Sequence, residues 1–313
     1  MKIAVKIIIY AFITLSVCSE VTAAEKYAFI KSKDLKQIND VITGFSESFP
    51  KARISVLNLD GSKNVRKVRK FINAEKPSVL LCLGTLAAEA AVEAEKGIPI
   101  VFLMVINYKR YGFYQQKNVT GISMEIPSMS LFTQFRMILP QINSIAVPYH
   151  PEISSEIVDE AMKVSKKMKI HLEPLRITNP KRIKKYLKSK KNKIKGIWML
   201  ADTKLYNRKT RAIYDLMSFS KDAKKPVMAF SEAFLRIGAF FSISISYKSL
   251  GSQTALISRQ IVQDKANPSD IPVAPPIGTY TVLNTKAAEQ MFGDDLDETV
   301  FDEVDKLYPE TEE

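Results

Sequence analysis

The sequence predicts an α/β protein: two doubly wound parallel-sheet lobes joined by a hinge. Three observations indicate this class. Short continuous apolar runs, such as VLLCL at 79–83, alternate with segments whose apolar residues recur at helical spacing. Runs of this kind are typical of parallel strands that are covered on both faces. The alternation restarts after Pro127, and 313 residues suffice for two lobes of common size.

The first half of the chain predicts one such lobe. We expect strands at 27–30, 54–57, 79–83, 98–106 and 119–123, and helices at 35–49, 65–72 and 85–95. The stretch NVTGIS at 118–123 contains a glycosylation acceptor pattern, yet its β-branched residues suit a strand. We therefore interpret 119–123 as the fifth strand and the residues after it as the first crossover into the second lobe.

The second half repeats the alternation without repeating the sequence. We expect strands at 144–149, 171–177, 197–200, 227–230 and 240–245, and helices at 131–139, 154–168, 181–190, 208–221 and 250–262. A proline-rich extended piece at 271–283 and a helix at 285–291 follow. Each lobe would then hold about five strands, a common number for such sheets.

The N-terminus has the pattern of a secretory signal peptide. Lys2 and Lys6 precede a short apolar run at 7–17, and small residues follow, which predicts a signal peptide at 1–24 and a mature start at Glu25. A retained anchor is the alternative. Lipidation at Cys18 is disfavoured because Val17 stands where a small residue is expected. The predicted location is periplasmic, or otherwise outside the cytoplasm.

Charge is unevenly distributed along the chain. The formal net charge is +13, and Lys and Arg concentrate between 163 and 195, where Tyr186 is the sole aromatic residue. Without interleaved aromatic rings this run does not suit nucleic acid, and we favour a solvated lysine face. A face lying against anionic lipid headgroups is the alternative. The acidic C-terminal tail at 294–313 is expected to be disordered beyond its first turn.

Catalysis has little support in the composition. A chain cut after residue 24 keeps two histidines and one cysteine, Cys82, which lies in an apolar run and is expected to be an inert core thiol. Zinc-ligand spacing, a nucleophile elbow and a phosphate loop are all missing from the sequence. We therefore predict a protein that is not an enzyme and needs no metal or cofactor.

Candidate binding residues follow the predicted strands, where ligands of open parallel sheets bind. Gly84 allows close backbone approach and Thr85 begins a helix whose first N–H groups suit a carboxylate. Asp202 or Glu232 would pair with a ligand ammonium, and Tyr108 or Tyr149 would stack on an apolar part. Each residue taken alone is equally consistent with a plain loop position. The full set of predicted ligand-binding residues is Ser32, Gly84, Thr85, Asn107, Tyr108, Tyr149, Asp202, Thr203, Ser231 and Glu232.

Six segments, in order, resemble the tryptophan/tyrosine-type ABC transporter substrate-binding proteins, which have the type I periplasmic binding fold. They are LLCLGTLAAEAA, GIPIVFLMVIN, NVTGIS, MLADT, KPVMAFSEAFLRIGAFFSISISYKSLGSQTA and DIPVAPPIGTYTVLNTKAAEQMFG. The resemblance implies that Gly84 and Thr85 hold a ligand carboxylate and that Asp202 faces the cleft. This chain departs from the family pattern at Asn107-Tyr108, where relatives usually have Asp-Pro, and at Ser246, where many have Asp; these departures leave the ligand class open.

The resemblance also implies a domain plan and a function. Lobe one would comprise 25–121 and 252–293, and lobe two 122–251. A small polar solute, amino-acid-like or otherwise, would be captured between the lobes, which close by a hinge, and an inner-membrane ABC permease would receive it from the monomeric protein. The alternatives are a sensory receptor of the same fold for a membrane signalling partner and an α/β enzyme.

Overall fold

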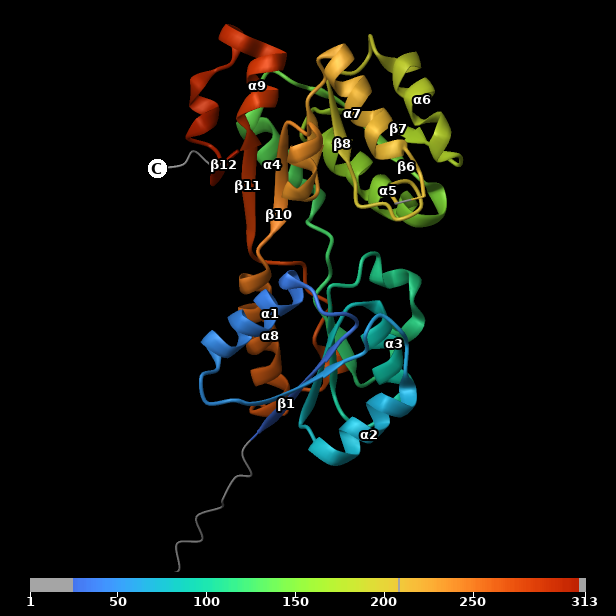
Figure 1. The fold of residues 1–313 in the computed structure, drawn as a ribbon, viewed down its shortest axis with the longest axis vertical. Helices are drawn as coiled ribbons and strands as arrows, with labels where there is room; N and C mark the ends of the chain where they lie inside the picture. Colours follow the sequence, from blue (N-terminus) through green and yellow to red (C-terminus); the bar gives the residue numbers. More distant parts are fainter. Residues whose placement is uncertain (1–24, 208, 310–313) are drawn as a thin grey trace, which may run out of the picture.

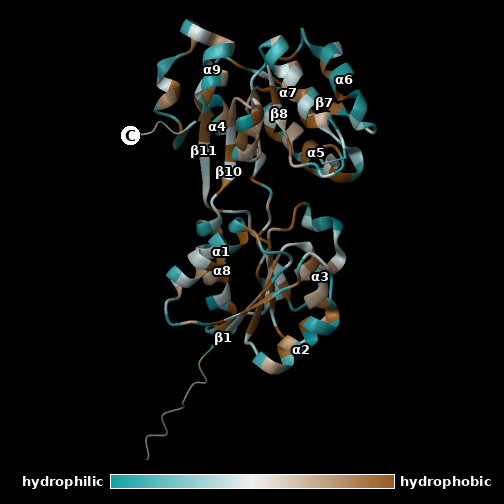
Figure 2. Cartoon of the chain, in the orientation of Figure 1, coloured by the Kyte–Doolittle hydropathy of each residue, from teal (hydrophilic) through white to brown (hydrophobic). Residues whose placement is uncertain are grey.

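The computed structural model describes residues 25–207 and 209–309, which form two α/β lobes placed one above the other (Figure 1). The predicted signal peptide and Cys18 lie outside the described residues. Within the part that is described, no helix has the length and apolar character needed to cross a membrane. Apolar residues fill the strands, and hydrophilic ones cover the outer faces of the helices (Figure 2).

The first lobe is a five-stranded parallel sheet in the order β2-β1-β3-β4-β5. Its strands are β1 (Lys26–Lys31), β2 (Arg53–Asn58), β3 (Val79–Leu83), β4 (Ile100–Leu103) and β5 (Val119–Gly121). Side chains alternate across the sheet, so Phe29 packs with Phe45, whereas Ile30 packs with Val68 on the other face. The helices of this lobe are α1 (Lys36–Ser48), α2 (Val65–Glu75), α3 (Thr85–Ala94) and α8 (Tyr247–Val262).

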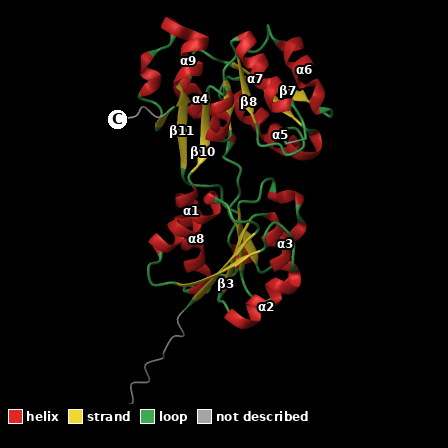
Figure 3. Ribbon diagram, viewed as in Figure 1, coloured by secondary structure: helices red, strands yellow, loops and turns green. Residues whose placement is uncertain are grey.

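The second lobe is a seven-stranded sheet in the order β12-β11-β10-β9-β8-β6-β7. Its strands are β6 (Ser144–Tyr149), β7 (His171–Arg176), β8 (Gly196–Met199), β9 (Val227–Ala229), β10 (Phe241–Ile245), β11 (Thr279–Asn284) and β12 (Lys306–Tyr308). Helices cover both faces, as Figure 3 shows. They are α4 (Ser128–Ile138), α5 (Pro151–Lys167), α6 (Ile183–Lys190), α7 (Ala212–Ala223) and α9 (Thr285–Phe292).

The domain plan expected from the sequence needs correction at its C-terminal boundary. We expected 252–293 to belong to lobe one, but β11 pairs antiparallel with β10 and therefore extends the second sheet. The acidic tail expected at 294–313 is ordered through its described part, because two short 3-10 helices lead into β12, which pairs with β11. The second sheet consequently holds seven strands, two more than expected. The sequence could not predict these two additional strands, because extended segments with weak polar–apolar alternation do not indicate which sheet they join.

Short 3-10 helices complete the chain. They are η1 (Tyr108–Arg110), η2 (Gly112–Gln115), η3 (Pro180–Arg182), η4 (Glu232–Ile237), η5 (Pro268–Asp270), η6 (Gly293–Asp295) and η7 (Glu298–Phe301). The expected helix at 208–221 begins later, at Ala212, and the expected strand at 98–106 is confined to β4. The 3-10 helix η4 closely follows β9, so its first residues lie at the carboxyl end of that strand.

The chain passes between the lobes three times, and the three crossings run together. The first follows β5, the second lies at Ser246 between β10 and α8, and the third precedes β11. The Ser123 N–H donates to the Ala274 carbonyl at 2.8 Å, which joins the first crossing to the third. The Ser246 N–H donates to the Gly278 carbonyl at 3.0 Å, which joins the second to the third. The three crossings therefore form one connection, around which the lobes can move relative to each other.

Glycines let α8 dock on α1 and so hold it in the first lobe. A Cβ at Gly44 would overlap the Lys248 carbonyl oxygen, and one at Gly251 would overlap the Val41 carbonyl oxygen. The two helix backbones therefore touch at these residues, closer than any larger side chain would permit. This contact explains why α8 belongs to lobe one although it follows a strand of lobe two.

Candidate functional site

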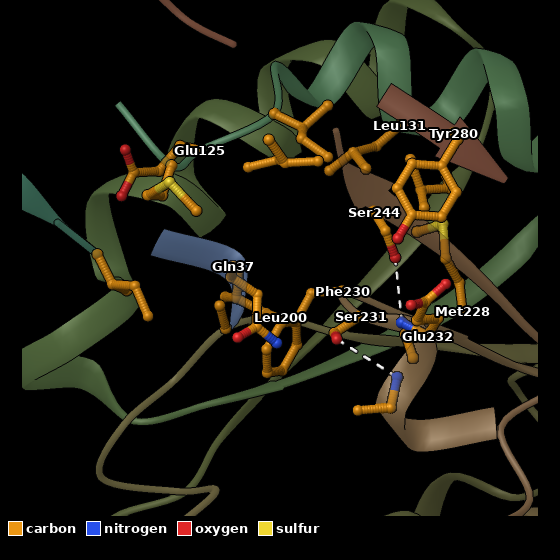
Figure 4. Close-up of a pocket in the computed structure, with 18 of the residues that line it drawn as sticks. Gln37, Glu125, Leu131, Leu200, Met228, Phe230, Ser231, Glu232, Ser244 and Tyr280 are labelled. Atoms are coloured by element: carbon orange, nitrogen blue, oxygen red, sulfur yellow. Dashed lines mark hydrogen bonds between the residues drawn. The ribbon is translucent and has the colours of Figure 1, made fainter. Parts of the chain in front are cut away.

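A cavity of about 370 Å³ lies between the lobes, at the carboxyl ends of the second lobe's strands. Residues from α1, from the first crossing and from the ends of β8, β9 and β10 line it, and Figure 4 shows most of their side chains. Its size is in the range of small-molecule sites. The lining residues are Lys36, Gln37, Asp40, Ile106, Asn107, Met124, Glu125, Ile126, Leu131, Ile157, Trp198, Leu200, Ala201, Met228, Ala229, Phe230, Ser231, Glu232, Ala233, Ile243, Ser244, Ile245, Tyr247 and Tyr280.

The second lobe supplies an apolar wall to this cavity. Trp198 on β8 is 3% exposed and packs edge-on against Phe132 of α4, with ring centroids 5.6 Å apart. Met228 and Ile243 belong to the same buried cluster and come from neighbouring strands. Because the wall is made of strand and helix residues fixed by the core, its shape is largely set before any ligand arrives.

One side of the cavity is polar and gathers around η4. The Glu232 N–H donates to the Ser244 hydroxyl at 3.0 Å, and the Ser231 hydroxyl accepts from the Ala233 N–H at 3.4 Å. Burial, and then the nearby Glu232 carboxylate, raise the pKa of both Tyr247 and Tyr280 above the ordinary phenol value. Figure 4 shows Glu232, Ser244 and Tyr280 together, across the cavity from Glu125. This side thus combines a carboxylate with hydroxyl groups that remain protonated.

Asn107 and Glu125 form a second polar group, where the two lobes meet. The Asn107 N–H donates to Glu125 Oε1 at 2.5 Å, and Asn107 Nδ2 donates to the Ile153 carbonyl in the first turn of α5 at 3.1 Å. Asn107 is 7% exposed and has a left-handed backbone, with φ 52°. Two buried acceptors here, Asn107 Oδ1 and Glu125 Oε2, have no hydrogen-bond partner within the described chain. Such atoms are costly unless a further donor arrives.

Glu125 makes stability sensitive to pH. Burial raises the pKa of its carboxyl above the ordinary 4.5, although the Asn107 N–H acts in the opposite direction. The contribution of this group to stability is therefore complete below the unfolded-state pKa and is lost as pH rises through the folded-state pKa. Glu125→Gln is expected to raise the melting temperature at neutral pH, with a gain that shrinks as pH falls toward 4.5.

Melting curves recorded across this pH range test the Glu125 prediction. Glu160→Gln is the matched control, because Glu160 is an exposed residue of α5 beside the same cleft and should leave the pH profile unchanged. Identical pH profiles for Glu125→Gln and the natural protein would contradict the assignment of this titration to Glu125.

A further cavity of about 460 Å³ adjoins the first and shares Asn107 and Glu125 with it. Tyr108, Lys109 and Arg110 line it from lobe one, facing acidic residues of α5. Lys109 Nζ lies 3.9 Å from a Glu156 carboxylate oxygen across the cleft. The Tyr108 ring itself packs among aromatic residues of lobe one, 5.3 Å from Phe102 by ring centroids.

Three predicted site residues lie together at the start of α3. The Ser32 hydroxyl accepts from the Ala87 N–H at 3.0 Å and so satisfies one first-turn donor of the helix. Gly84 has φ 91°, and a Cβ there would lie 2.7 Å from Ser32 Oγ, so glycine is required. Thr85 is the first residue of α3. Neither cavity is lined by these three residues.

Asp202 is placed differently from the expectation that it faces the cleft. It is 2% exposed, and its side chain does not line either cavity. Oδ2 accepts from the His150 N–H at 2.8 Å and from the Ser154 hydroxyl at 2.9 Å, while Oδ1 accepts from the N–H groups of Lys204 and Leu205. Its lone pairs are thus occupied by the chain itself, and the carboxylate ties the β8 turn to the start of α5.

The remaining predicted residues divide between the cavity and its surroundings. Asn107, Ser231 and Glu232 line the first cavity, as expected from their positions after strands. Tyr149 is half-buried against the core, and Thr203 is exposed on the turn beside Asp202; neither of them lines the two cavities described above. The structure therefore brings together three of the ten predicted residues in this cavity and gathers another three at α3.

Several lining residues escaped the sequence prediction. Lys36, Gln37 and Asp40 project from the first turns of α1, and Trp198 and Tyr280 lie within strands rather than after them. The α1 residues could have been recognised from one sequence pattern: they are polar, and they lie on the side of the helix opposite the buried Ile38 and Val41. Glu125 lacked any signal, because it lies in the crossover between lobes.

Metal chemistry has no support among the described residues, which contain no group of three His, Cys, Asp or Glu side chains suited to a metal ion. Cys82 is a buried thiol of the first lobe's core, and burial raises its pKa, so it stays protonated.

Comparison with known proteins identifies similar chains. A family model described as ABC transporter substrate binding protein matches residues 33–306. A tyrosine-binding protein from Clostridioides difficile (strain R20291) is 23% identical over 222 residues, covering 69% of this chain and 63% of that protein. The match thus spans somewhat less than two thirds of that relative's length.

Solved structures share the fold. The ABC domain from Streptococcus pneumonia, in complex with L-Trp, is 19% identical, with a TM-score of 0.62 and coverage of 91% of this chain and 100% of that one. The ligand-free, open structure of a substrate-binding protein with adhesive properties from Clostridium difficile is also 19% identical, with a TM-score of 0.74 over 92% and 100% of the chains. The two lobes have the type I periplasmic binding fold that the sequence predicted.

Proposed function

This chain belongs to the ABC transporter substrate-binding protein family, and from that premise we propose that its interlobe cavity captures an amino acid with a large apolar side chain. A solute-binding role for an ABC permease is common to the family. We further propose that export depends on the predicted signal peptide at 1–24 and that the protein acts as a monomer.

The observation that carries the proposal is the two-sided chemistry of the cavity. Trp198, Met228 and Ile243 supply an apolar wall, and Glu232 with Tyr280 supplies a polar side. A free amino acid has the matching distribution, because one end is charged and the other is apolar. Binding sites with a mostly apolar lining and a few placed polar groups select such ligands.

The charged residues around the cavity indicate which part of the ligand each of them would bind. We assign the ligand ammonium to Glu232, with Asp40 of α1 lining the same cavity from lobe one. The carboxylate would be held from lobe one by Lys36, which lines the cavity, whereas the α3 start at Gly84 and Thr85, which the family resemblance implied, lines neither cavity. Asn107 Oδ1 and Glu125 Oε2 are buried acceptors without partners in the described chain, and they suit any further ligand donor. Asp202 is left out of this set because its oxygens are occupied.

Capture works by a shift in population between lobe arrangements. Residues from both lobes line the cavity, so a bound solute contacts both only when they are close. Ligand therefore favours the closed arrangement, and that arrangement is what a permease would recognise. Binding alone achieves this, and no catalytic step is part of the proposal. A sensory receptor of the same fold would use the same closure with a signalling partner in place of the permease.

Thermal shift with defined amino acids tests the ligand class. L-Tyr, L-Trp and L-Phe are expected to raise the melting temperature, and at about 100 times its dissociation constant a ligand adds roughly 2.7 kcal/mol of stability. L-Glu, L-Lys and ribose serve as small polar controls that should not. A response to the polar set alone would overturn the apolar-side-chain assignment, and turnover of any ligand would overturn the non-enzymatic one.

A further inference from the structure

The net charge of the chain resides in one segment. Residues 163–195 contain fourteen Lys and Arg side chains against a single acid, Glu173, a net of +13 that equals the formal charge of the whole chain. The rest of the protein is therefore neutral on balance. We call this segment, together with Lys221, Lys224 and Lys225 at the end of α7, the basic face.

The basic face is exposed and largely uncompensated. Twelve of the fourteen side chains are exposed, and Lys184 and Lys190 are half-buried. Among the described residues, ion pairs reach only two of the fourteen: Lys184 with Asp222 and Lys190 with Glu173. Like charges also crowd each other, because burial together with the charges of Lys191 and Lys195 lowers the pKa of Lys225. An arrangement of this kind is unfavourable for the isolated protein unless an anionic partner relieves it.

The topology places most of this charge away from the ligand cavity, and only Arg176, Lys181 and Arg182 lie at or follow the carboxyl end of β7, the edge strand. The cavity lies at the carboxyl ends of the strands, next to Leu200 and Phe230. The helices run back along the sheet, so α5, α6 and α7 end at its opposite end, and their last turns carry Lys167, Lys188 and Lys221. β7 also forms the outer edge of the sheet. A partner on the basic face would thus leave the cleft uncovered.

The opposite edge of the same sheet is acidic, so positive and negative charge lie on opposite sides of the lobe. Residues 294–309, which lead into the edge strand β12, contain seven exposed carboxylates against Lys306. Figure 1 shows β12 and α6 on opposite sides of the upper lobe. The lobe is therefore an electric dipole across its sheet, and an extended anionic surface would attract one edge and repel the other.

We propose that the basic face docks the second lobe on an anionic phospholipid bilayer, with the acidic edge pointing away and the cleft open to solute. The family acts outside the cytoplasm, where a membrane surface is the adjacent polyanion. The face is formed by helix ends and one sheet edge, and fifteen of its seventeen cationic residues are Lys. Diffuse lysine charge suits lipid headgroups, whereas nucleic acid favours Arg forks and stacked aromatic rings.

Vesicle co-sedimentation of the exported protein tests this. Binding is expected to vesicles of phosphatidylglycerol and phosphatidylcholine in equal parts, at about 0.1 M salt, and to disappear at about 1 M salt. Lys185→Gln, Lys188→Gln, Lys191→Gln and Lys193→Gln, combined, should weaken it at least about tenfold, because each surface lysine adds to the attraction. The four side chains are exposed and are not among the ion pairs of the described chain, so folding should survive the change.

A control variant that loses the same number of lysines elsewhere distinguishes the effect of where the charge lies from the effect of the total net charge. Lys51→Gln, Lys70→Gln, Lys96→Gln and Lys117→Gln remove the same charge from exposed positions of lobe one and should keep vesicle binding within about twofold. Equal losses in the two variants, or equal binding to pure phosphatidylcholine, would overturn the proposal. Binding to an oligonucleotide without binding to vesicles would overturn it in favour of nucleic acid. Salt-sensitive self-association that the first variant abolishes, again without vesicle binding, would instead indicate docking on the acidic edge of a second copy.

Discussion

Asp202→Ala is expected to lower the free energy of unfolding by about 3 kcal/mol or more, because it leaves several buried donors without an acceptor. The carboxylate accepts from the His150 N–H and the Ser154 hydroxyl on one oxygen and from two N–H groups of its own turn on the other. Removing this carboxylate breaks the hydrogen-bonded connection between the turn after β8 and the start of α5. Chemical denaturation monitored by the fluorescence of Trp198, the single tryptophan, measures the loss.

The matched control for this prediction is Asp159→Ala, an exposed aspartate of α5 in the same lobe. It should change the free energy of unfolding by less than about 0.5 kcal/mol. A different outcome would restore the role suggested by the family resemblance: if Asp202→Ala keeps full stability and loses ligand, the carboxylate turns toward the cleft when solute is bound.

Glu232→Gln is expected to weaken binding of the amino acid by about 2 kcal/mol, or roughly 30-fold, because a charge partner of the ammonium is lost as the cleft closes. The side chain is exposed in the described arrangement, so the melting temperature without ligand should barely change. Calorimetric titration with the ligand found by thermal shift measures the change.

Glu289→Gln is the control for Glu232, since it removes the same charge from an exposed position of α9 in the same lobe. It should bind ligand as the natural protein does. Full affinity in Glu232→Gln would exclude this residue as the ammonium partner and direct attention to Asp40, which lines the cavity from lobe one.

The candidate site could be predicted for residues that directly follow a strand, because strand order alone places them at the ligand-binding edge of the sheet. Ser231 and Glu232 come after β9, and in a parallel sheet that position always faces the ligand edge. Asp202 occupies an equivalent position after β8, but the N–H groups of its own turn and of His150 reach its carboxylate first. Whether a polar side chain at a strand end meets ligand or chain depends on these neighbouring donors, which are distant in sequence.

Lining residues within elements could not be identified in the same way. Trp198 and Tyr280 resemble core residues in sequence, and Trp198 does pack in the core, yet each also borders the cavity. Glu125 lies in a crossover without regular structure, and it lines a cavity whose other residues come from both lobes. The two lobes must be placed in space before such residues can be assigned.

The sequence by itself determined the fold class and most of the local elements before residue 294, because apolar periodicity and β-branched runs specify helices and covered strands within a short window. It also determined the family, through six ordered segments. Only the tertiary structure decided which sheet the last strands join: β11 and β12 extend the second lobe, whereas α8 lies in the first, as the family resemblance implied for residues from 252 on. Those choices depend on the pairing of β11 with β10 and of β12 with β11, and on the glycine contact with α1, all between residues far apart in the chain. Pairing of that kind leaves little trace in local sequence, since the same extended pattern can complete either sheet.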